Sequence, residues 1–403
     1  MRIRLSSTSV IKFSVALFII YQTYIQNKII SIPRFIPIMS GVILLLFLLH
    51  YHAHKASSFV KLPRECFYFL FYSCSMLLIG MIGSTSISSH LSRCMDVFGY
   101  MFLMFSLVYV CLLDASPMFA LKTVFITSII LAISFIRNPV LLPTGRYSLT
   151  MIVNPNSLGM SMMSGIWCAI CLKRRNAINL FIMLLSFTVF AYVMFLSASL
   201  KSISAILVFF VVDYLFSVRR NVYEQKGKNA RFLLDILVAI VVVIAVYIFF
   251  AQESAFYSTI VGQRISSIME GTASDKRIRL YRYGIEIIKE HPIVGVGFNG
   301  YEGLVGNYSH STLIEVFASG GFIGGTIYFF GFFAMIIKYL KNYIYENKKH
   351  SLSAHGSGEA IAGMALMTVL IFVIIHPYEM KSYVNYALCI CLANTPKFEK
   401  EDK

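Results

Sequence analysis

The sequence predicts an all-α polytopic membrane protein, and three observations lead to that fold class. Of the 403 residues, 58% are hydrophobic and only 13% are charged, whereas soluble domains carry about 25% charged residues. The mean hydropathy is +0.73. Apolar stretches of roughly the 20 residues that cross a bilayer recur along the whole chain. A soluble enzyme, a disordered chain and a disulfide-stapled secreted module are therefore excluded, and we treat 1–403 as a single integral membrane domain.

About twelve segments have the apolar content and the ~20-residue length of a transmembrane helix. The break between the fifth segment and the one before it rests on Asp114 and Pro117. The segments are 10–26, 35–50, 66–83, 95–113, 118–136, 155–172, 178–197, 201–218, 232–251, 313–337, 360–376 and 379–394.

The basic residues orient these helices. With the N-terminus placed in the cytoplasm, the segments on that side hold most of the lysines and arginines, as expected for cytoplasmic loops. This supports an even number of spans with both termini cytoplasmic. The same distribution accounts for most of the net charge of +16, so we expect no nucleic-acid partner. The cytoplasmic basic residues are Arg2, Arg4, Lys12, Lys55, Lys61, Arg64, Lys173, Arg174, Arg175, Arg219, Arg220, Lys226, Lys228, Arg231, Lys338, Lys341, Lys348, Lys349, Lys397, Lys400 and Lys403.

The cysteine and histidine patterns predict neither a disulfide framework nor a metal or other cofactor. The eight cysteines lie in or beside apolar segments, and Cys168-x-x-Cys171 is typical of helix packing. The three histidines of 50–54 alternate on the predicted cytoplasmic side, where we interpret them as an interfacial edge. The N-terminus has a basic start without a small-residue cleavage site, which favours a signal anchor.

One long loop, 252–312, breaks the charge pattern, because it is predicted to be extracytoplasmic and yet carries several basic residues. Ordered loops of this length are usually functional. Within it, 277–290 has apolar residues at helical spacing and charged residues on another side, which predicts an amphipathic helix on the membrane surface. His291-Pro292 is expected to end that helix. The apolar positions are Ile278, Tyr281, Ile285 and Ile288, and the charged ones are Arg279, Arg282, Glu286 and Lys289.

A glycine run follows the predicted helix, with Gly295, Gly297 and Gly300 in the spacing G-x-G-x-x-G. This spacing is weak support for a dinucleotide site, because the run follows a helix rather than a strand. We interpret it as a turn that brings the amphipathic helix back over the membrane.

Two interpretations of the loop's arginines stay open. Arginine binds phosphate oxygens bidentately and keeps its charge, so a cluster at the outer face can hold a lipid diphosphate. The alternative is attraction to anionic lipid head groups, worth about 1 kcal/mol per charge. His310, at the membrane edge beside this loop, is either a catalytic base or an interfacial hydrogen-bonding residue.

A series of motifs in a fixed order resembles a known family. The motifs are Asn154-Pro-Asn156-Ser-Leu-Gly159, Ser197-Ala-Ser199-Leu-Lys201, Arg277 with the aromatic Tyr281, Pro292-x-x-Gly295-x-Gly297, His310, and Gly321-x-x-Gly324. Together, over 154–325, they resemble the O-antigen ligase and O-antigen polymerase superfamily of bacterial polysaccharide assembly. Three positions depart from the family pattern, with Lys201 for arginine, Ser311 for asparagine and Ser319 for glutamate, although Glu315 lies one turn away.

The resemblance implies a helical fold like that of class C glycosyltransferases. It also implies an enzyme of the bacterial plasma (inner) membrane that needs no metal or cofactor. We expect a polymerase of O-antigen or a related surface polysaccharide. It would transfer an undecaprenyl-diphosphate-linked glycan, with inversion, onto a sugar hydroxyl of another lipid-linked repeat unit. The partners would be undecaprenyl-diphosphate-linked oligosaccharide, membrane lipid, a flippase and a chain-length regulator.

Two other functions are alternatives to the polymerase. An O-antigen ligase would transfer the glycan to lipid A-core, and Ser311 favours the polymerase because ligases tend to keep asparagine there. A polysaccharide or glycolipid transporter or flippase is the rival from another class. It is disfavoured because coupled transporters place ionisable groups inside the bundle, and the middles of the predicted spans hold almost no acidic residues.

The resemblance and the chemistry together assign roles to ten residues. Fixed cations stabilise the negative charge that develops on a leaving diphosphate, a role given to Arg277, Arg279 and Lys201. A base raises the nucleophilicity of the acceptor hydroxyl, with His310 as first choice and Glu315 as second. Positioning of the substrate loop is assigned to Tyr281, Arg282, Gly295, Gly297 and Asn156.

Overall fold

The computed structural model describes most of the chain and shows an all-α membrane protein. Every predicted span coincides with a helix except 232–251, which lies outside the described residues, as does most of 252–274 of the long loop. Within the described part of the chain, five helices are long and apolar enough to cross a membrane, and twelve spans stay a prediction. The described residues are 7–25, 34–54, 60–143, 145–151, 154–218, 262–263, 266, 275–348, 354–373 and 378–395.

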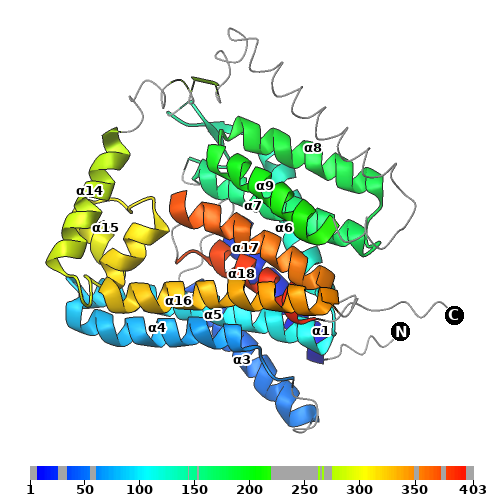
Figure 1. The fold of residues 1–403 in the computed structure, drawn as a ribbon, viewed down its shortest axis with the longest axis horizontal. Helices are drawn as coiled ribbons and strands as arrows, with labels where there is room; N and C mark the ends of the chain where they lie inside the picture. Colours follow the sequence, from blue (N-terminus) through cyan, green and yellow to red (C-terminus); the bar gives the residue numbers. More distant parts are fainter. Residues whose placement is uncertain are drawn as a thin grey trace.

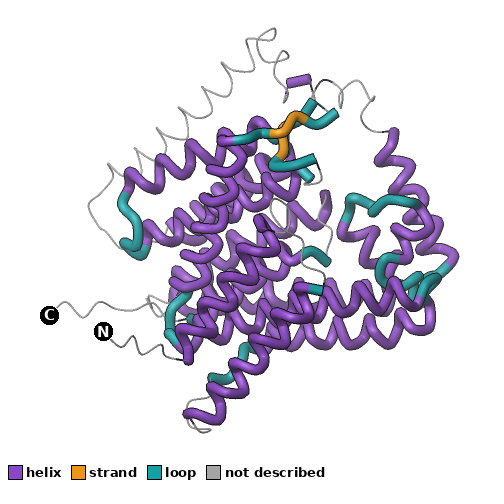
Figure 2. Tube along the Cα trace, turned by 180° about the vertical axis from the view of Figure 1, so that it is seen from behind, coloured by secondary structure: helices purple, strands orange, loops and turns teal. Residues whose placement is uncertain are grey.

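Helices make up almost all of the described chain, and Figure 2 shows one short hairpin among them. The hairpin pairs β1 (Val140–Leu141) antiparallel with β2 (Tyr147–Ser148). The α-helices are α1 (Ser7–Ile20), α3 (Phe35–His54), α4 (Arg64–Gly83), α5 (Ile87–Leu113), α6 (Met118–Arg137), α7 (Pro155–Arg174), α8 (Leu180–Leu196), α9 (Leu200–Asp213), α14 (Asp275–Glu290), α15 (Gly300–Val305), α16 (Thr312–Lys348), α17 (Ala354–Val373) and α18 (Met380–Asn394), with π-helical turns η1 (Tyr21–Ile25) after α1 and η3 (Tyr214–Val218) after α9.

The α7 helix is the central helix of the bundle. Nearly all of its residues from Pro155 to Leu172 are buried, and its Trp167 packs against Phe209 of α9. The two ends of α7 mark two ends of the molecule. They lie about 30 Å apart, because α7 has 20 residues and each residue of an α-helix rises 1.5 Å. We call them the His310 end, where Asn154 meets the loop before α16, and the Arg174 end, where Arg174 meets Asp213 of α9.

The α14 helix matches the predicted helix in position and ends before His291-Pro292 as expected. In Figure 1, α14 and α15 stand beside the start of α16. Ile278 and Ile285 of the predicted apolar stripe are about half exposed, while Leu280 and Ile287 are buried against the protein. The helix therefore has a second apolar face that packs inward, and the seating of the predicted stripe on the membrane surface stays a prediction. Gly284 lies on the packed side, where its missing side chain lets Ile314 of α16 approach the helix backbone.

Candidate active site

A break in α16 fixes the shape of the loop that precedes it. Gly321 has φ 59° and ψ −160°, which no helix contains, and this frees backbone groups on both sides of it. The N–H groups of Val296 and Gly297 donate to the carbonyls of Ala318 and Ser319, at 2.9 and 2.8 Å. The N–H of Phe322 donates to the carbonyl of Pro292 at 2.7 Å.

Glycine is needed on both sides of this junction. Gly295 has a φ of +65°, and a Cβ there would lie 2.5 Å from the carbonyl oxygen of Ala318. A Cβ on Gly321 would meet the backbone of Ile293. The two glycine motifs of the sequence therefore lock the loop onto the broken helix, and we call this junction the glycine lock. A turn at Gly295 and Gly297 agrees with the prediction, while its return over the membrane stays a prediction.

His90 of α5 supports the same loop from the opposite side. The ring is fully buried, its Nδ1 accepts the N–H of Phe298 at 2.9 Å, and it stacks on the Phe298 ring. Gly297 carries no side chain that would collide with this ring. Sequence reasoning missed His90, which stands about two hundred residues before its partner.

The locked loop leads into the segment that carries His310. His310 has a positive φ of 58°, and its ring centroid lies 4.0 Å from that of Tyr308. The Tyr308 hydroxyl accepts a hydrogen bond from Asn154 Nδ2 at 3.0 Å. The start of α7 and the start of α16 thus meet at His310.

Glu315 holds the His310 segment in place. Its side chain is 2% exposed, and its Oε2 accepts the N–H of Ser309 at 3.0 Å. The Ser309 hydroxyl donates to the carbonyl of Ser311 at 2.9 Å, which closes a tight turn around His310. This geometry supports a positioning role for Glu315, while its role as second-choice base stays a prediction.

The arginines of α14 point in different directions. Arg277 is half-buried and lies close enough to Tyr308 to lower its pKa, whereas Arg279 and Arg282 are exposed. Residues two positions apart do not share a helix face, so the structure brings Arg277, but not Arg279, to the His310 segment. Tyr281 is half-buried and acts electrostatically on Tyr301.

The electrostatics around Tyr308 keep its hydroxyl protonated. Burial, and to a smaller extent the nearby Glu379, raise the pKa of Tyr308, while the hydrogen bond with Asn154 and the charge of Arg277 lower it, and together they bring the pKa to about 12. Tyr308 is therefore a neutral hydrogen-bonding group over the physiological pH range.

Lys201 and Asn156 belong to a second group at the same end. Lys201 is 6% exposed at the start of α9, next to the turn at Ser197. Arg146 of the hairpin donates to the carbonyl of Ser197 and to Asn156 Oδ1, both at 2.9 Å. Arg146 therefore ties Asn156 at the start of α7 to the turn before Lys201.

A cavity of about 290 Å³ opens beside Asn154, between η1, α5, α7 and α18. Its lining includes three charged residues that sequence reasoning did not select, namely Arg93, Glu379 and Lys381. Arg93 Nε donates to Asn299 Oδ1 at 2.8 Å, and Lys381 Nζ donates to the Ser157 carbonyl at 2.9 Å and to the Ser157 hydroxyl. The only sequence signal for Arg93 and Lys381 was that both are basic residues outside the predicted cytoplasmic segments.

The described residues hold no group of three or more His, Cys, Asp or Glu side chains that could bind a metal ion. The ionisable groups gathered at the His310 end are instead a histidine, the glutamates Glu315 and Glu379, and several cations. Such a set can move a proton and can stabilise an anion.

Comparison with known proteins supports the resemblance stated above. No curated protein matches the chain. The family model described as O-antigen ligase matches residues 181–329, which contain α8, α9, α14, α15 and the first half of α16. The matched region includes Lys201, Arg277 and His310. Over these residues the chain is similar to the O-antigen ligase family, which confirms the resemblance to the O-antigen ligase and O-antigen polymerase superfamily.

Proposed function

We propose that the protein is a polymerase of O-antigen or a related surface polysaccharide. Members of its family are glycosyltransferase-like membrane enzymes of O-antigen and lipopolysaccharide biosynthesis. One observation carries the proposal, namely that the glycine lock and Glu315 hold His310 beside Tyr308, with Arg277 near the same hydroxyl. A fixed base and a fixed cation at one end of a membrane bundle suit transfer from a lipid diphosphate.

The reaction is an inverting displacement at the first sugar of an undecaprenyl-diphosphate-linked glycan. The acceptor hydroxyl forms the new C–O bond and the bond from that carbon to the diphosphate breaks, with the electron pair leaving on the diphosphate. His310 accepts the hydroxyl proton. Arg277 and Lys201 stabilise the developing negative charge. The residues assigned to these steps need no metal.

An O-antigen ligase is the second candidate, and the description of the matching family model favours it. Ser311 stands where ligases tend to carry asparagine, and this favours the polymerase. The two differ only in the acceptor, which is another lipid-linked repeat unit for the polymerase and lipid A-core for the ligase.

The proposal also sets the surroundings of the enzyme. The protein lies in the bacterial inner membrane with both termini cytoplasmic, so the His310 end faces the outer side. A flippase supplies the lipid-linked units at that face, and a chain-length regulator acts on the product.

A deletion strain tests the function directly. We expect the strain to carry a single repeat on its core if the protein is a polymerase, and bare core with lipid-linked polymer if it is a ligase. Normal chains in that strain would refute both functions. The readout is the gel pattern of the surface polysaccharide.

The same strain tests the site through complementation. Arg277→Ala should abolish long chains, because the leaving diphosphate loses its fixed cation, while Lys289→Ala, an exposed basic position on the same helix, should restore them. Long chains from the Arg277→Ala protein would remove Arg277 from the site. A periplasm-active reporter should be active when fused near Gly306 and silent when fused near Lys226, and the reverse result would overturn the orientation.

A further inference from the structure

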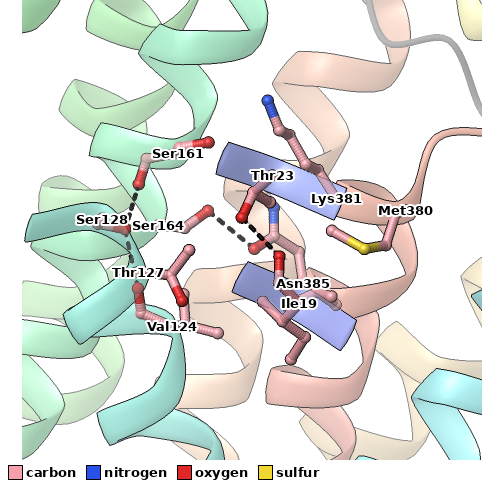
Figure 3. A pocket seen from close by; sticks show the side chains of 11 residues that line it. Ile19, Thr23, Val124, Thr127, Ser128, Ser161, Ser164, Met380, Lys381 and Asn385 are labelled. Carbon is pink, nitrogen blue, oxygen red and sulfur yellow. Dashed lines mark hydrogen bonds between the residues drawn. The ribbon is translucent and has the colours of Figure 1, made fainter. Parts of the chain in front are cut away.

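The cavity beside Asn154 continues into the bundle and narrows. Its deeper part has a volume of only about 30 Å³, against about 290 Å³ for the outer part. The two parts share Thr23, Ser161, Met380 and Lys381 in their linings, and Figure 3 shows the deeper part. The outer volume is close to the roughly 300 Å³ lower limit of typical small-molecule pockets, and the inner one has room for little more than a water molecule.

We call the outer and the deeper part together the pit. The walls of the pit are polar although they lie between membrane helices. Ser157, Ser161 and Ser164 follow one face of α7 at intervals of four and three residues. Lys381 and Asn385 stand one turn apart on the facing side of α18. A lipid tail would leave these polar groups without hydrogen-bond partners, so the lining excludes it.

Two amide atoms of the lining point to a polar ligand. Asn385 is 1% exposed, and its Oδ1 accepts the Ser164 hydroxyl at 2.8 Å. Its Nδ2 finds no hydrogen-bond partner among the described residues, and the same is true of the Gln22 Oε1 in the outer part. A buried donor or acceptor without a partner is costly. The pit thus offers one donor deep inside and one acceptor nearer its opening.

We propose that this pit binds the terminal sugar of the acceptor glycan, and the proposal rests on the polymerase function above. The sugar ring occupies the outer part, where one of its hydroxyls donates to the Gln22 acceptor. The deeper part has room only for a single hydroxyl or a bridging water, which accepts from the Asn385 donor. A tapering pit admits the end of a glycan chain and not its middle. Its opening lies at Asn154, whose side chain bonds Tyr308 next to His310, so a sugar seated there reaches the proposed base.

The charges of the lining argue against the diphosphate as the occupant. Arg93 and Lys381 are cationic, but the Glu379 carboxylate stands beside them in the outer part, where it would repel a second anion. Beyond Lys381 the deeper part is lined by hydroxyls, an amide and apolar groups. That combination is suited to a neutral hydroxylated ligand.

The test separates the acceptor from the donor. Membrane vesicles containing the full chain receive two substrates. One is the lipid-linked repeat unit as donor, and the other is the repeat-unit oligosaccharide released from the strain's own lipid-linked precursor by mild acid and labelled at its reducing end. The labelled oligosaccharide keeps its other end free, so it can serve only as acceptor. The rate at which the labelled oligosaccharide is elongated, measured while the concentration of each substrate is varied in turn, gives a KM for each substrate and a kcat.

Two variants alter the pit and one serves as a matched control. Ser161→Leu fills the junction between the two parts, and Asn385→Leu removes the deep donor with little change in volume. The control is Ser204→Leu, which makes the same serine-to-leucine substitution at an exposed position of α9. For both pit variants we expect the KM for the oligosaccharide to rise about tenfold, with the donor KM and kcat unchanged, while the control behaves like the wild type.

Each other outcome overturns the proposal or identifies a different failure. A rise in the donor KM instead would assign the pit to the donor, and unchanged constants would remove the glycan from it. Polymer formation by the wild type without any elongation of the oligosaccharide would also refute a pit that recognises the terminal sugar. If Ser161→Leu fails to accumulate in the membrane, Asn385→Leu decides. If the wild type transfers nothing from the lipid-linked donor to any acceptor, it is the polymerase function that fails.

Discussion

The two ends of α7 hold their charged side chains in opposite ways. At the Arg174 end, Arg174 makes two hydrogen bonds to the carboxylate of Asp213, at 2.9 and 2.5 Å. Arg175 makes two to the fully buried Glu359, at 3.1 and 2.6 Å. Two cations and two anions therefore neutralise one another. Each guanidinium makes a bidentate pair with one carboxylate.

At the His310 end, the cations mainly bond neutral oxygen atoms. Arg146 bonds a carbonyl and an amide oxygen, and Lys381 bonds the carbonyl and the hydroxyl of Ser157. Arg93 bonds the Asn299 amide and makes only a long 3.9 Å contact with Asp96. Neutral partners hold a cation in place without cancelling its charge.

This difference suggests that the charged residues at the Arg174 end stabilise the fold and those at the His310 end serve function. Removing one member of a buried ion pair leaves an uncompensated charge and destabilises the fold. Removing a group from the other end should leave the fold intact and change what the protein can bind or transfer. The four predictions below test that division, beginning with the largest effect.

His310→Ala should lower the transfer rate by about 10²- to 10⁴-fold, the usual contribution of a general base. The melting temperature of the purified protein should not change, because the ring is only half-buried in a loop held by Glu315 and the glycine lock. His291→Ala, at an exposed histidine of the same loop, is the matched control and should keep full activity. Normal chains from the His310→Ala protein would exclude it as the base.

Glu359→Ala should have the opposite effect. It leaves Arg175 without its carboxylate at a buried position, which costs about 3–5 kcal/mol. We expect a lower melting temperature and less protein in the membrane, with unchanged transfer per folded molecule. Glu286→Ala removes an exposed carboxylate and should change neither quantity. A Glu359→Ala protein of normal stability but low activity would contradict the division between the two ends.

Local sequence signals predicted where the helix of the loop ends, but not which of its faces packs against the protein. The proline at 292 placed the end of α14 correctly, because the residue before a proline avoids helix. The buried face of α14 could not be read from Ile278 and Ile285, since the contact between Gly284 and Ile314 joins two elements that are distant in sequence.

The cavity was missed for the same reason, because Gln22, Arg93 and Lys381 come from three separate helices. A signal was nevertheless present in α7, where Asn154, Ser157, Ser161 and Ser164 repeat at helical spacing in an otherwise apolar segment. A polar stripe of this kind inside a predicted span indicates a face turned away from lipid. The identities of the facing residues still require the tertiary structure.

Gly295→Ala should weaken the lock between the loop and the broken α16. The added Cβ would lie 2.5 Å from the Ala318 oxygen, at a backbone φ of +65°. Gly306→Ala is a matched control, because Gly306 has a φ of +75° with open space around its Cβ position. We expect both variants to lose about 1 kcal/mol from the left-handed backbone, and only Gly295→Ala to lose transfer activity as well, measured as chain length on gels. Equal activity in the two proteins would mean that the lock does not position His310.

Tyr308→Phe should have the smallest effect of the four. It removes the hydrogen bond from Asn154 at 3.0 Å while keeping the ring that stacks on His310, so transfer should fall only a few-fold, equivalent to about 1 kcal/mol. The pKa of Tyr308 is about 12, above its ordinary value, so the hydroxyl stays neutral until the solution is strongly alkaline. The pH profile of transfer between about pH 6 and 9 should therefore be the same in the variant and the wild type. A shift of that profile would show that Tyr308 itself exchanges a proton, and the base would then have to be sought at the tyrosine rather than at His310.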